Sequence, residues 1–145
     1  GDTAVEKHVT HLYPDDSIAL IVQQLEVTPA LTTLSDDETL FRHSVHEFAE
    51  GEIRPHVREM DEQAKIPRQL IDTLFELGVM GIEIPEAFGG AGASFFHSVL
   101  GVEALSRVDP WVGVLVDVQN TLVINALLRW GNDEQKRTYL TRLAR

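Results

Sequence analysis

Apolar residues recur every three or four positions in the segment that follows residue 34, which is the spacing of one helix face. The first such stripe contains Leu40, Phe41, Val45, Phe48, Ala49 and Ile53. Ser35 followed by Glu38 is the capping-box pattern, which predicts that the helix starts after Ser35. Pro55 restricts Arg54 and predicts a bend or an end, with a second helix reaching about Ala64.

The same signals predict two more helices, one on each side of a loop. Pro67 begins a helix whose end is marked by Gly78, because glycine readily takes the left-handed conformation found there. Ser94 is expected to cap the next helix, which buries Phe95, Val99, Val102 and Leu105. The stretch 79–92 is rich in glycine and proline and is predicted as a loop, with brief extended character at Ile82–Ile84.

The segment from Asp109 to Trp130 is predicted to be the longest helix, and it is apolar almost all round. A helix of this kind is expected to be buried on nearly every side. It nevertheless carries four polar side chains, which need partners when buried: Asp117, Gln119, Asn120 and Asn125. Either neighbouring residues provide these partners, or the helix lines a cavity where a ligand binds. For Asp117 the candidate partners are an arginine or a helix N-terminus.

Gly131 ends the long helix, and Asn132 caps a last one in which Tyr139, Leu140 and Leu143 have no predicted partner. The fold class that follows is all-α, a helical bundle of five to six helices with no sheet. Its predicted extent is residues 34–145, whereas residues 1–33 are expected to form a partly ordered N-terminal arm, either of low order or with one docked short helix at Ile18–Leu25. The last helix runs into Arg145 without a closing signal, so the chain is expected to be cut short.

Composition excludes several functional classes. The chain of 145 residues has a formal net charge of −11, with 23 acidic and 12 basic side chains. Nucleic acid and anionic membrane surfaces both require a basic face, so neither is a predicted partner. The polar side chains of the long helix would be costly in lipid, so no membrane span is predicted. No cysteine is present, which excludes disulfides and thiol catalysis.

Local chemistry assigns no catalytic residue and no metal site. His43 and His46 have a spacing found in metal sites, but no third ligand is apparent and a solvated helix face is the better interpretation. The glycine-rich stretch 89–92 does not fit a phosphate loop, since Phe95 stands at the third glycine position and no lysine follows. Its glycines are predicted to allow a tight turn and a close approach of the backbone to a partner.

The order of short motifs from Leu34 to Arg145 carries more information than any single motif. In chain order they are Leu77-Gly78 with Gly81, Pro85-Glu86 with Gly89-Gly90 and Gly92, Glu103–Leu105, and Gly131 with Glu134-Gln135-Lys136 and Tyr139-Leu140. The series resembles the N-terminal helical domain of acyl-CoA dehydrogenases. The forms MGIE, GGAGASFF and QNTL resemble the short/branched-chain members. Thr141 departs from the family pattern, in which proline often follows the Tyr-Leu pair.

The resemblance implies an FAD-dependent enzyme that dehydrogenates acyl-CoA thioesters between the α and β carbons. In that family the catalytic base lies in a C-terminal helical domain and most flavin contacts come from a central β-domain, and this sequence contains neither domain. The resemblance therefore implies that no catalytic residue lies in this chain, that it does not hold FAD, and that it is inactive alone. The alternatives are an acyl-CoA oxidase and a free-standing helical interaction module without catalysis.

The resemblance also implies that the long helix forms a wall of the acyl pocket. By position, the substrate-binding residues would be Val114, Leu115, Val118, Gln119 and Leu122. They lie one to four residues apart and can share one face of the helix. Gln119 would shape or shorten the pocket for a short or branched acyl group. The alternative, that all five are plain core residues, is equally open.

Partners and location follow from the resemblance alone. It implies an acyl-CoA substrate, an electron-transfer flavoprotein as redox partner, and a homo-oligomer when the protein is full length. The location would be the mitochondrial matrix in a eukaryote and the cytoplasm in a bacterium.

Overall fold

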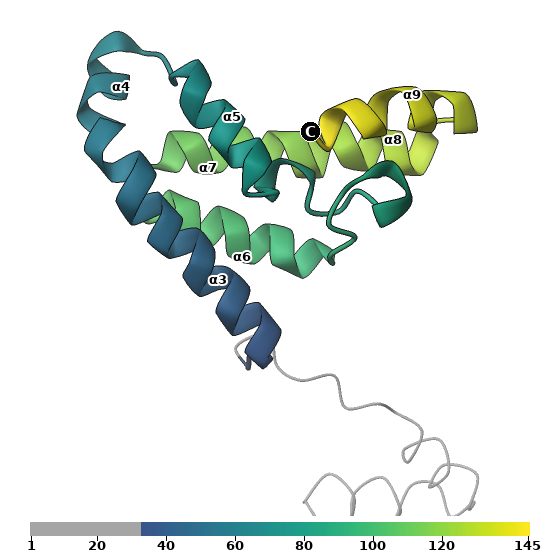
Figure 1. Ribbon diagram of the computed structural model, residues 1–145, viewed down its shortest axis with the longest axis horizontal. Helices are drawn as coiled ribbons and strands as arrows, with labels where there is room; N and C mark the ends of the chain where they lie inside the picture. Colours follow the sequence, from purple (N-terminus) through teal and green to yellow (C-terminus); the bar gives the residue numbers. More distant parts are fainter. Residues whose placement is uncertain (1–32) are drawn as a thin grey trace, which may run out of the picture. The chain divides into compact units, whose positions relative to one another are not determined.

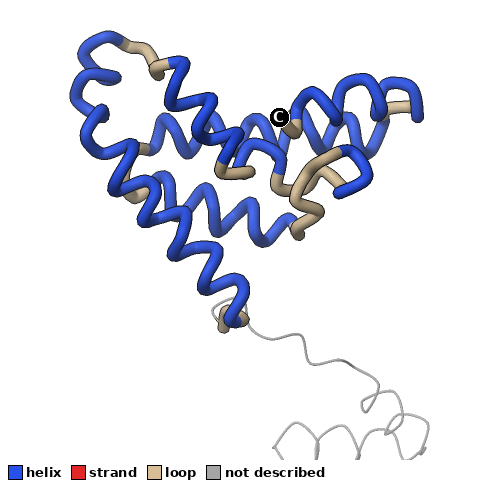
Figure 2. The backbone as a smooth tube through the Cα atoms, viewed as in Figure 1, coloured by secondary structure: helices blue, strands red, loops and turns tan. Residues whose placement is uncertain are grey.

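The computed structural model describes residues 33–145, in which five helical rods are joined by short connections (Figure 1). The first rod is α3 (Asp36–Phe48), η1 (Ala49–Ile53), η2 (Arg54–His56) and α4 (Val57–Gln63). The others are α5 (Arg68–Glu76), α6 (Phe95–Ser106), the long helix of α7 (Pro110–Asp117), η5 (Val118–Ile124) and α8 (Asn125–Trp130), and finally α9 (Asp133–Leu143). No strand occurs among these residues (Figure 2), and the predicted all-α fold is confirmed. The predicted helix at Ile18–Leu25 lies outside the described residues.

Local sequence signals set the ends of the helices. The Ser35 Oγ accepts a hydrogen bond from the Glu38 N–H at 3.2 Å, and the Glu38 carboxylate accepts one from the Ser35 N–H at 2.8 Å. Asn132 and Gln135 form a second capping box at the start of α9. Gly78 follows α5 with a φ of 85°, the left-handed conformation predicted for it.

Pro55 bends the first rod without ending it. Proline lacks an N–H and its ring clashes with the preceding turn of an α-helix. The backbone therefore passes through the π turn η1 and the 3-10 turn η2 before α4 resumes. Ala64, which is left-handed with a φ of 47°, ends α4. The predicted bend and the predicted second helix are both confirmed.

The main core lies where α6 packs against both α3 and α7 (Figure 1). Gly113 of α7 allows a close approach to α6, since a Cβ at this position would overlap the Ser106 side chain. Buried side chains of these elements, of α5 and of the turn after it fill the core: Val45, Ala49, Ile53, Leu74, Val79, Leu105, Val112 and Val116. Their removal from water is the main force that stabilises the fold.

A second, smaller cluster joins α9 to the long helix. Leu140 is fully buried with Ile84 and Ile124, and Leu143 packs against them. The expectation that these side chains of α9 lack partners is therefore wrong for Leu140 and Leu143, because the loop before α6 and the long helix cover them. Tyr139 is exposed.

The stretch between α5 and α6 forms turns rather than extended chain. It contains two 3-10 turns, η3 (Val79–Gly81) and η4 (Glu86–Phe88), and Ile82 has right-handed helical angles. The extended segment expected at Ile82–Ile84 is therefore wrong. The turn directs Ile82 into the main core and Ile84 into the smaller cluster, whereas alternate residues of a strand face the same side.

The long helix is long and apolar enough to cross a membrane by length and composition, with 21 residues and a mean hydropathy of 1.5. The core helix of a folded domain passes the same test. Here Val112, Val116 and Ile124 are buried within the fold. One face of this helix is therefore part of the core.

Candidate functional site

The long helix buries one face and leaves another open. The buried face carries residues four positions apart, namely Val112, Val116, Asn120 and Ile124. On the other side, four apolar side chains are exposed and are called the open face: Trp111 (43%), Val114 (55%), Val118 (39%) and Leu122 (63%). The expectation of burial on nearly every side is wrong for this face, because no described element covers it.

The structure brings together three of the five residues that the resemblance places in the acyl pocket. Val114, Val118 and Leu122 lie four residues apart and belong to the open face. Leu115 packs against the main core instead. The Gln119 amide is half-buried and donates to the Leu143 carbonyl at 3.5 Å. Leu115 is therefore a core residue, whereas the exposed Val114, Val118 and Leu122 are not.

Asn120 attaches the middle of the long helix to the turn after α5. Its side chain is fully buried. Its Nδ2 donates to the Val79 carbonyl at 2.8 Å and to the Val116 carbonyl at 3.0 Å, and its Oδ1 accepts from the Ile82 N–H at 3.0 Å. Both polar atoms of the amide are thus satisfied, so neighbouring residues provide the partners that a buried asparagine requires.

The long helix changes from α to π geometry at Val118, two residues before Asn120. The π turn η5 covers Val118–Ile124, and π turns inside α-helices are frequent at functional sites. Two side chains donate to carbonyl groups of the preceding turn, where the hydrogen-bonding pattern changes: Asn120 to Val116, and the Thr121 Oγ1 to Asp117 at 2.9 Å. The π turn therefore determines how Val118 and Leu122 are presented on the open face.

Asp117 has a partner on its own helix. Its carboxylate is half-buried and accepts a hydrogen bond from the Thr121 Oγ1 at 3.0 Å. In the described residues no arginine lies within ion-pair distance of Asp117, so the arginine partner considered from the sequence is wrong. Thr121 replaces it.

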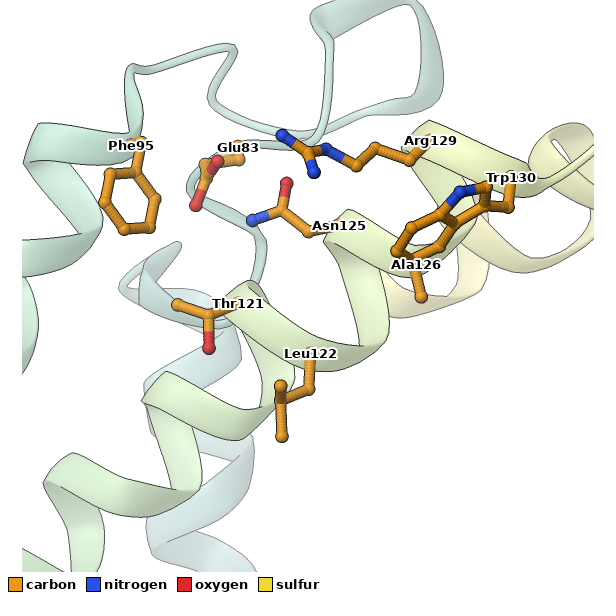
Figure 3. Close-up of a pocket in the computed structure, with 8 residues that line it drawn as sticks. All are labelled: Glu83, Phe95, Thr121, Leu122, Asn125, Ala126, Arg129 and Trp130. Carbon is orange, nitrogen blue, oxygen red and sulfur yellow. The ribbon is translucent and has the colours of Figure 1, made fainter.

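A pocket of about 470 Å³ opens where the open face ends (Figure 3). It is called the Arg129 pocket, and its lining residues are Glu83, Phe95, Thr121, Leu122, Asn125, Ala126, Arg129 and Trp130. Leu122 belongs to both the pocket and the open face. The Ser98 Oγ of α6 donates to the Glu83 carboxylate at 2.9 Å and so fixes its position. This pocket was not predicted from the sequence, although the four-residue spacing of Thr121, Asn125 and Arg129 indicates a shared helix face.

The glycine-rich loop before α6 uses its backbone groups internally. The N–H groups of residues 89–93 all donate to carbonyls of residues 81–86, at 2.8 to 3.4 Å. Gly89 and Gly92 have positive φ angles of 86° and 62°. A Cβ on Gly90 would overlap the Ile84 backbone. The predicted tight turn with a close backbone approach is confirmed, although the partner is the chain's own Ile84, and these N–H groups are not free to bind a phosphate.

His43 and His46 face carboxylates of their own rod. The Nε2 of His43 lies 3.2 Å from Glu47, and the Nε2 of His46 lies 3.8 Å from Glu50. Among residues 33–145, no three metal-ligating side chains come together. Both imidazoles therefore lie beside carboxylates on a polar face of the first rod.

Arg54 lowers the pKa of Glu50, because its guanidinium hydrogen-bonds the carboxylate. A lowered folded-state pKa stabilises the fold above the ordinary pKa of glutamate, and this contribution is lost as the pH falls through the lowered value. Both side chains are exposed, so a small effect is expected. Replacing Arg54 by Gln should lower the urea midpoint slightly near neutral pH and not at all below the lowered pKa. An equal difference at both pH values would contradict this assignment.

A family of known proteins matches most of this chain. Residues 35–145 match the family model described as acyl-CoA dehydrogenase, N-terminal domain. The chain belongs to the acyl-CoA dehydrogenase family. It is 45% identical over 114 residues to the mitochondrial short/branched chain specific acyl-CoA dehydrogenase of Bos taurus. It is 44% identical over 114 residues to the probable short/branched chain specific acyl-CoA dehydrogenase of Dictyostelium discoideum.

The acyl-CoA dehydrogenase relatives are much longer than this chain. Each alignment covers 79% of this chain but only 26% of the bovine relative and 28% of the Dictyostelium relative. The structure of butyryl-CoA dehydrogenase from Megasphaera elsdenii superimposes with a TM-score of 0.72 at 30% identity, over 77% of this chain and 30% of that one. The resemblance to the N-terminal domain of this family is thereby confirmed.

Proposed function

We propose that this chain is the N-terminal domain of an FAD-dependent acyl-CoA dehydrogenase and forms the wall along which the acyl group lies. The observation that carries the proposal is the exposed row of Val114, Val118 and Leu122 on a helix whose opposite face is core. An exposed apolar row on a packed domain marks a surface that binds another apolar group. The names of the three relatives support a short or branched acyl-CoA thioester as substrate.

The open face is suited to bind and orient an acyl group, not to react with it. Valine and leucine side chains offer dispersion contacts and no proton donor or acceptor. β-Branched valines have few rotamers, so Val114 and Val118 present a defined surface at little entropic cost. Gln119 is turned toward α9, and its proposed effect on pocket length acts through the position of its neighbours Val118 and Asn120.

The described residues do not fit FAD. The N–H groups of the glycine-rich loop are bonded internally, so they are not free to hold the phosphates of FAD. In this proposal, the other domains of the whole protein hold the flavin and supply the catalytic base. The whole protein would then pass electrons to an electron-transfer flavoprotein, act as a homo-oligomer, and work in the mitochondrial matrix or the bacterial cytoplasm.

The isolated 145-residue chain is expected to be colourless and unable to reduce a dye with short acyl-CoAs. The physical reason is that its described residues bring together neither a flavin site nor a base directed at the open face. The measurement is a visible spectrum of the purified chain followed by a dye-reduction assay with butyryl-CoA. A bound flavin spectrum together with turnover would contradict the proposed division of labour.

Val118→Asp is expected to weaken binding of butyryl-CoA to the chain by about tenfold or more, because a carboxylate replaces apolar contact area. The matched control is Val123→Asp, since Val123 has similar exposure on the same helix but lies outside the open face and the Arg129 pocket. Affinity is measured by titration followed by NMR, and circular dichroism verifies folding. Equal losses in both variants would show that the open face is not the acyl wall.

A further inference from the structure

A second pocket lies between α3 and α6 and shares no residue with the open face or the Arg129 pocket. It has a volume of about 320 Å³ and is called the α3/α6 pocket. Ala104 of α6 is buried there, and its short side chain leaves room between the longer groups around it. The spacing of the lining residues puts them on one face of each helix. These residues are Thr39, Arg42, His43 and His46 on α3, and Glu103, Ala104 and Arg107 on α6.

Positive charge collects in the α3/α6 pocket, although the chain as a whole has a net charge of −11. The lining contains the guanidinium groups of Arg42 and Arg107 and one carboxylate, that of Glu103. Glu103 accepts a hydrogen bond from Arg107 at 3.1 Å on its own helix. In the described part of the chain, Arg42 has no carboxylate within ion-pair distance. The fixed charges of the lining therefore favour an anion.

His46 contributes an imidazole nitrogen that lacks a partner. Its Nε2 lies 3.8 Å from the Glu50 carboxylate, and the neighbouring His43 lies beside Glu47. The His46 Nδ1 is buried and has no hydrogen-bond partner among residues 33–145. A buried polar atom without a partner is costly and indicates a bound molecule that supplies one. A ligand in the pocket that His46 lines can do so.

The mixture of donors and acceptors selects among anions. The two guanidinium groups and the Thr39 hydroxyl can donate to the oxygen atoms of a tetrahedral anion. The Glu103 carboxylate only accepts, and the His46 Nδ1 accepts in one of its neutral tautomers. An anion that retains a proton satisfies both kinds of group, whereas an anion without a proton places its oxygen atoms against the Glu103 carboxylate. Hydrogen phosphate retains a proton near neutral pH, and sulfate does not.

We propose that the α3/α6 pocket binds inorganic phosphate in its hydrogen phosphate form. Arg42 and Arg107 hold the anion from the two helices, and its O–H donates to Glu103. Because the anion binds the folded arrangement of α3 and α6, its binding stabilises the packing of these helices. A phosphate monoester has lost the corresponding proton at pH 7.5, since its second pKa is about 6, so free phosphate is the better ligand. The site is independent of the proposed acyl wall.

Three anions are titrated into the chain at pH 7.5 and followed by backbone NMR: inorganic phosphate, sulfate and glycerol 3-phosphate. Sodium chloride keeps the ionic strength constant, because salt screens exposed charges. Phosphate is expected to bind about tenfold more tightly than the other two, the effect of one charge-assisted hydrogen bond. The shifts should be confined to residues 39–46 and 103–107. Phosphate should also raise the thermal midpoint more than sulfate at equal concentration.

Arg42→Gln is expected to weaken phosphate binding by about fivefold or more, because the charge-assisted hydrogen bonds of the guanidinium are lost. The matched control is Arg58→Gln, an exposed arginine on α4 of the same rod, which should change nothing. Glu103→Gln should tighten sulfate binding and remove the preference for phosphate, since an amide can donate as well as accept. Circular dichroism verifies that each variant is folded.

Equal affinity for phosphate and sulfate in the parent chain, or no saturable shift with phosphate, would overturn the site. Equal losses in Arg42→Gln and Arg58→Gln would do the same. Tighter binding of glycerol 3-phosphate than of inorganic phosphate would overturn the choice of ligand, because the monoester lacks the proton that Glu103 selects. Arg42→Gln should leave the affinity for butyryl-CoA unchanged, and a loss of that affinity would overturn the independence of this pocket from the acyl wall.

Discussion

Replacing Asn120 by alanine is expected to lower the free energy of unfolding by about 3 kcal/mol. The side chain is fully buried and makes three hydrogen bonds with the Val79 carbonyl, the Val116 carbonyl and the Ile82 N–H. Alanine would leave two groups of the 79–82 turn without partners in the protein interior. An unpaired buried polar group costs about 1 to 3 kcal/mol, which exceeds the net value of the hydrogen bond that was lost.

The measurement is urea unfolding followed by circular dichroism, with Asn125→Ala as the matched control on the same helix. Asn125 is half-buried and lines the Arg129 pocket, so its replacement should cost about 0.5 kcal/mol or less. Asn120→Asp should destabilise as much as Asn120→Ala, since a carboxylate cannot donate to the Val79 carbonyl. A cost below about 1 kcal/mol for both Asn120 variants would show that the turn finds other partners.

The stability of this contact also bears on function. Asn120 lies in the π turn between Val118 and Leu122, two of the residues proposed to contact the acyl group. Its hydrogen bonds connect the helix to Ile82 and Val79, which precede Asn120 in the chain by 38 and 41 positions. The residue that holds the open face in place therefore points away from it, into the core.

Local signals in the sequence predicted most helix ends, but two expectations for α6 are wrong. Ser94 makes no capping hydrogen bond to the backbone of α6, since its hydroxyl pairs with the His97 Nδ1 instead, and Phe95 and Val99 are exposed rather than buried. The capping boxes at Ser35 and Asn132 and the left-handed Gly78 each depend on neighbours within four residues, so the sequence alone contains the necessary information. The bend at Pro55 is of the same kind. The family followed from the order of motifs, which is a property of the sequence and needs no geometry.

Features that depend on distant contacts were not predicted. The sequence indicated that a buried Asn120 needs partners, but not that these lie in the 79–82 turn, and it did not indicate the π turn that contains Asn120. Leu140 was expected to lack partners because Ile84 and Ile124 come to it through the tertiary fold. The Arg129 pocket combines Glu83 with Asn125 and Arg129, and only the packing of the turn before α6 brings them together.

Burial of the long helix was overestimated for a related reason. A helix that is apolar on all sides needs other groups to shield its surface from water. Its composition does not show which chain provides them. Val114 and Leu122 remain exposed within the described residues. The same composition therefore fits a core face on one side and a ligand-binding face on the other.

Gly90→Ala is expected to destabilise the domain by about 2 to 3 kcal/mol through overpacking. The added Cβ would overlap the carbonyl and the Cβ of Ile84, and a backbone carbonyl cannot rotate away as the end of a side chain can. Ile84 is fully buried in the cluster with Ile124 and Leu140. Moving Ile84 would therefore loosen α9 from the long helix as well as the loop itself.

Gly51→Ala is the matched control, since a Cβ at this exposed helical position meets nothing within 4 Å. Alanine is favoured over glycine in a helix, so this variant should be as stable as the parent or more stable by up to about 1 kcal/mol. Unfolding in urea gives both values, and amide hydrogen exchange should show faster exchange in α9 for Gly90→Ala only. If Gly90→Ala were as stable as Gly51→Ala, the close approach to Ile84 would not be a constraint, and the glycine-rich loop would be free to serve a ligand.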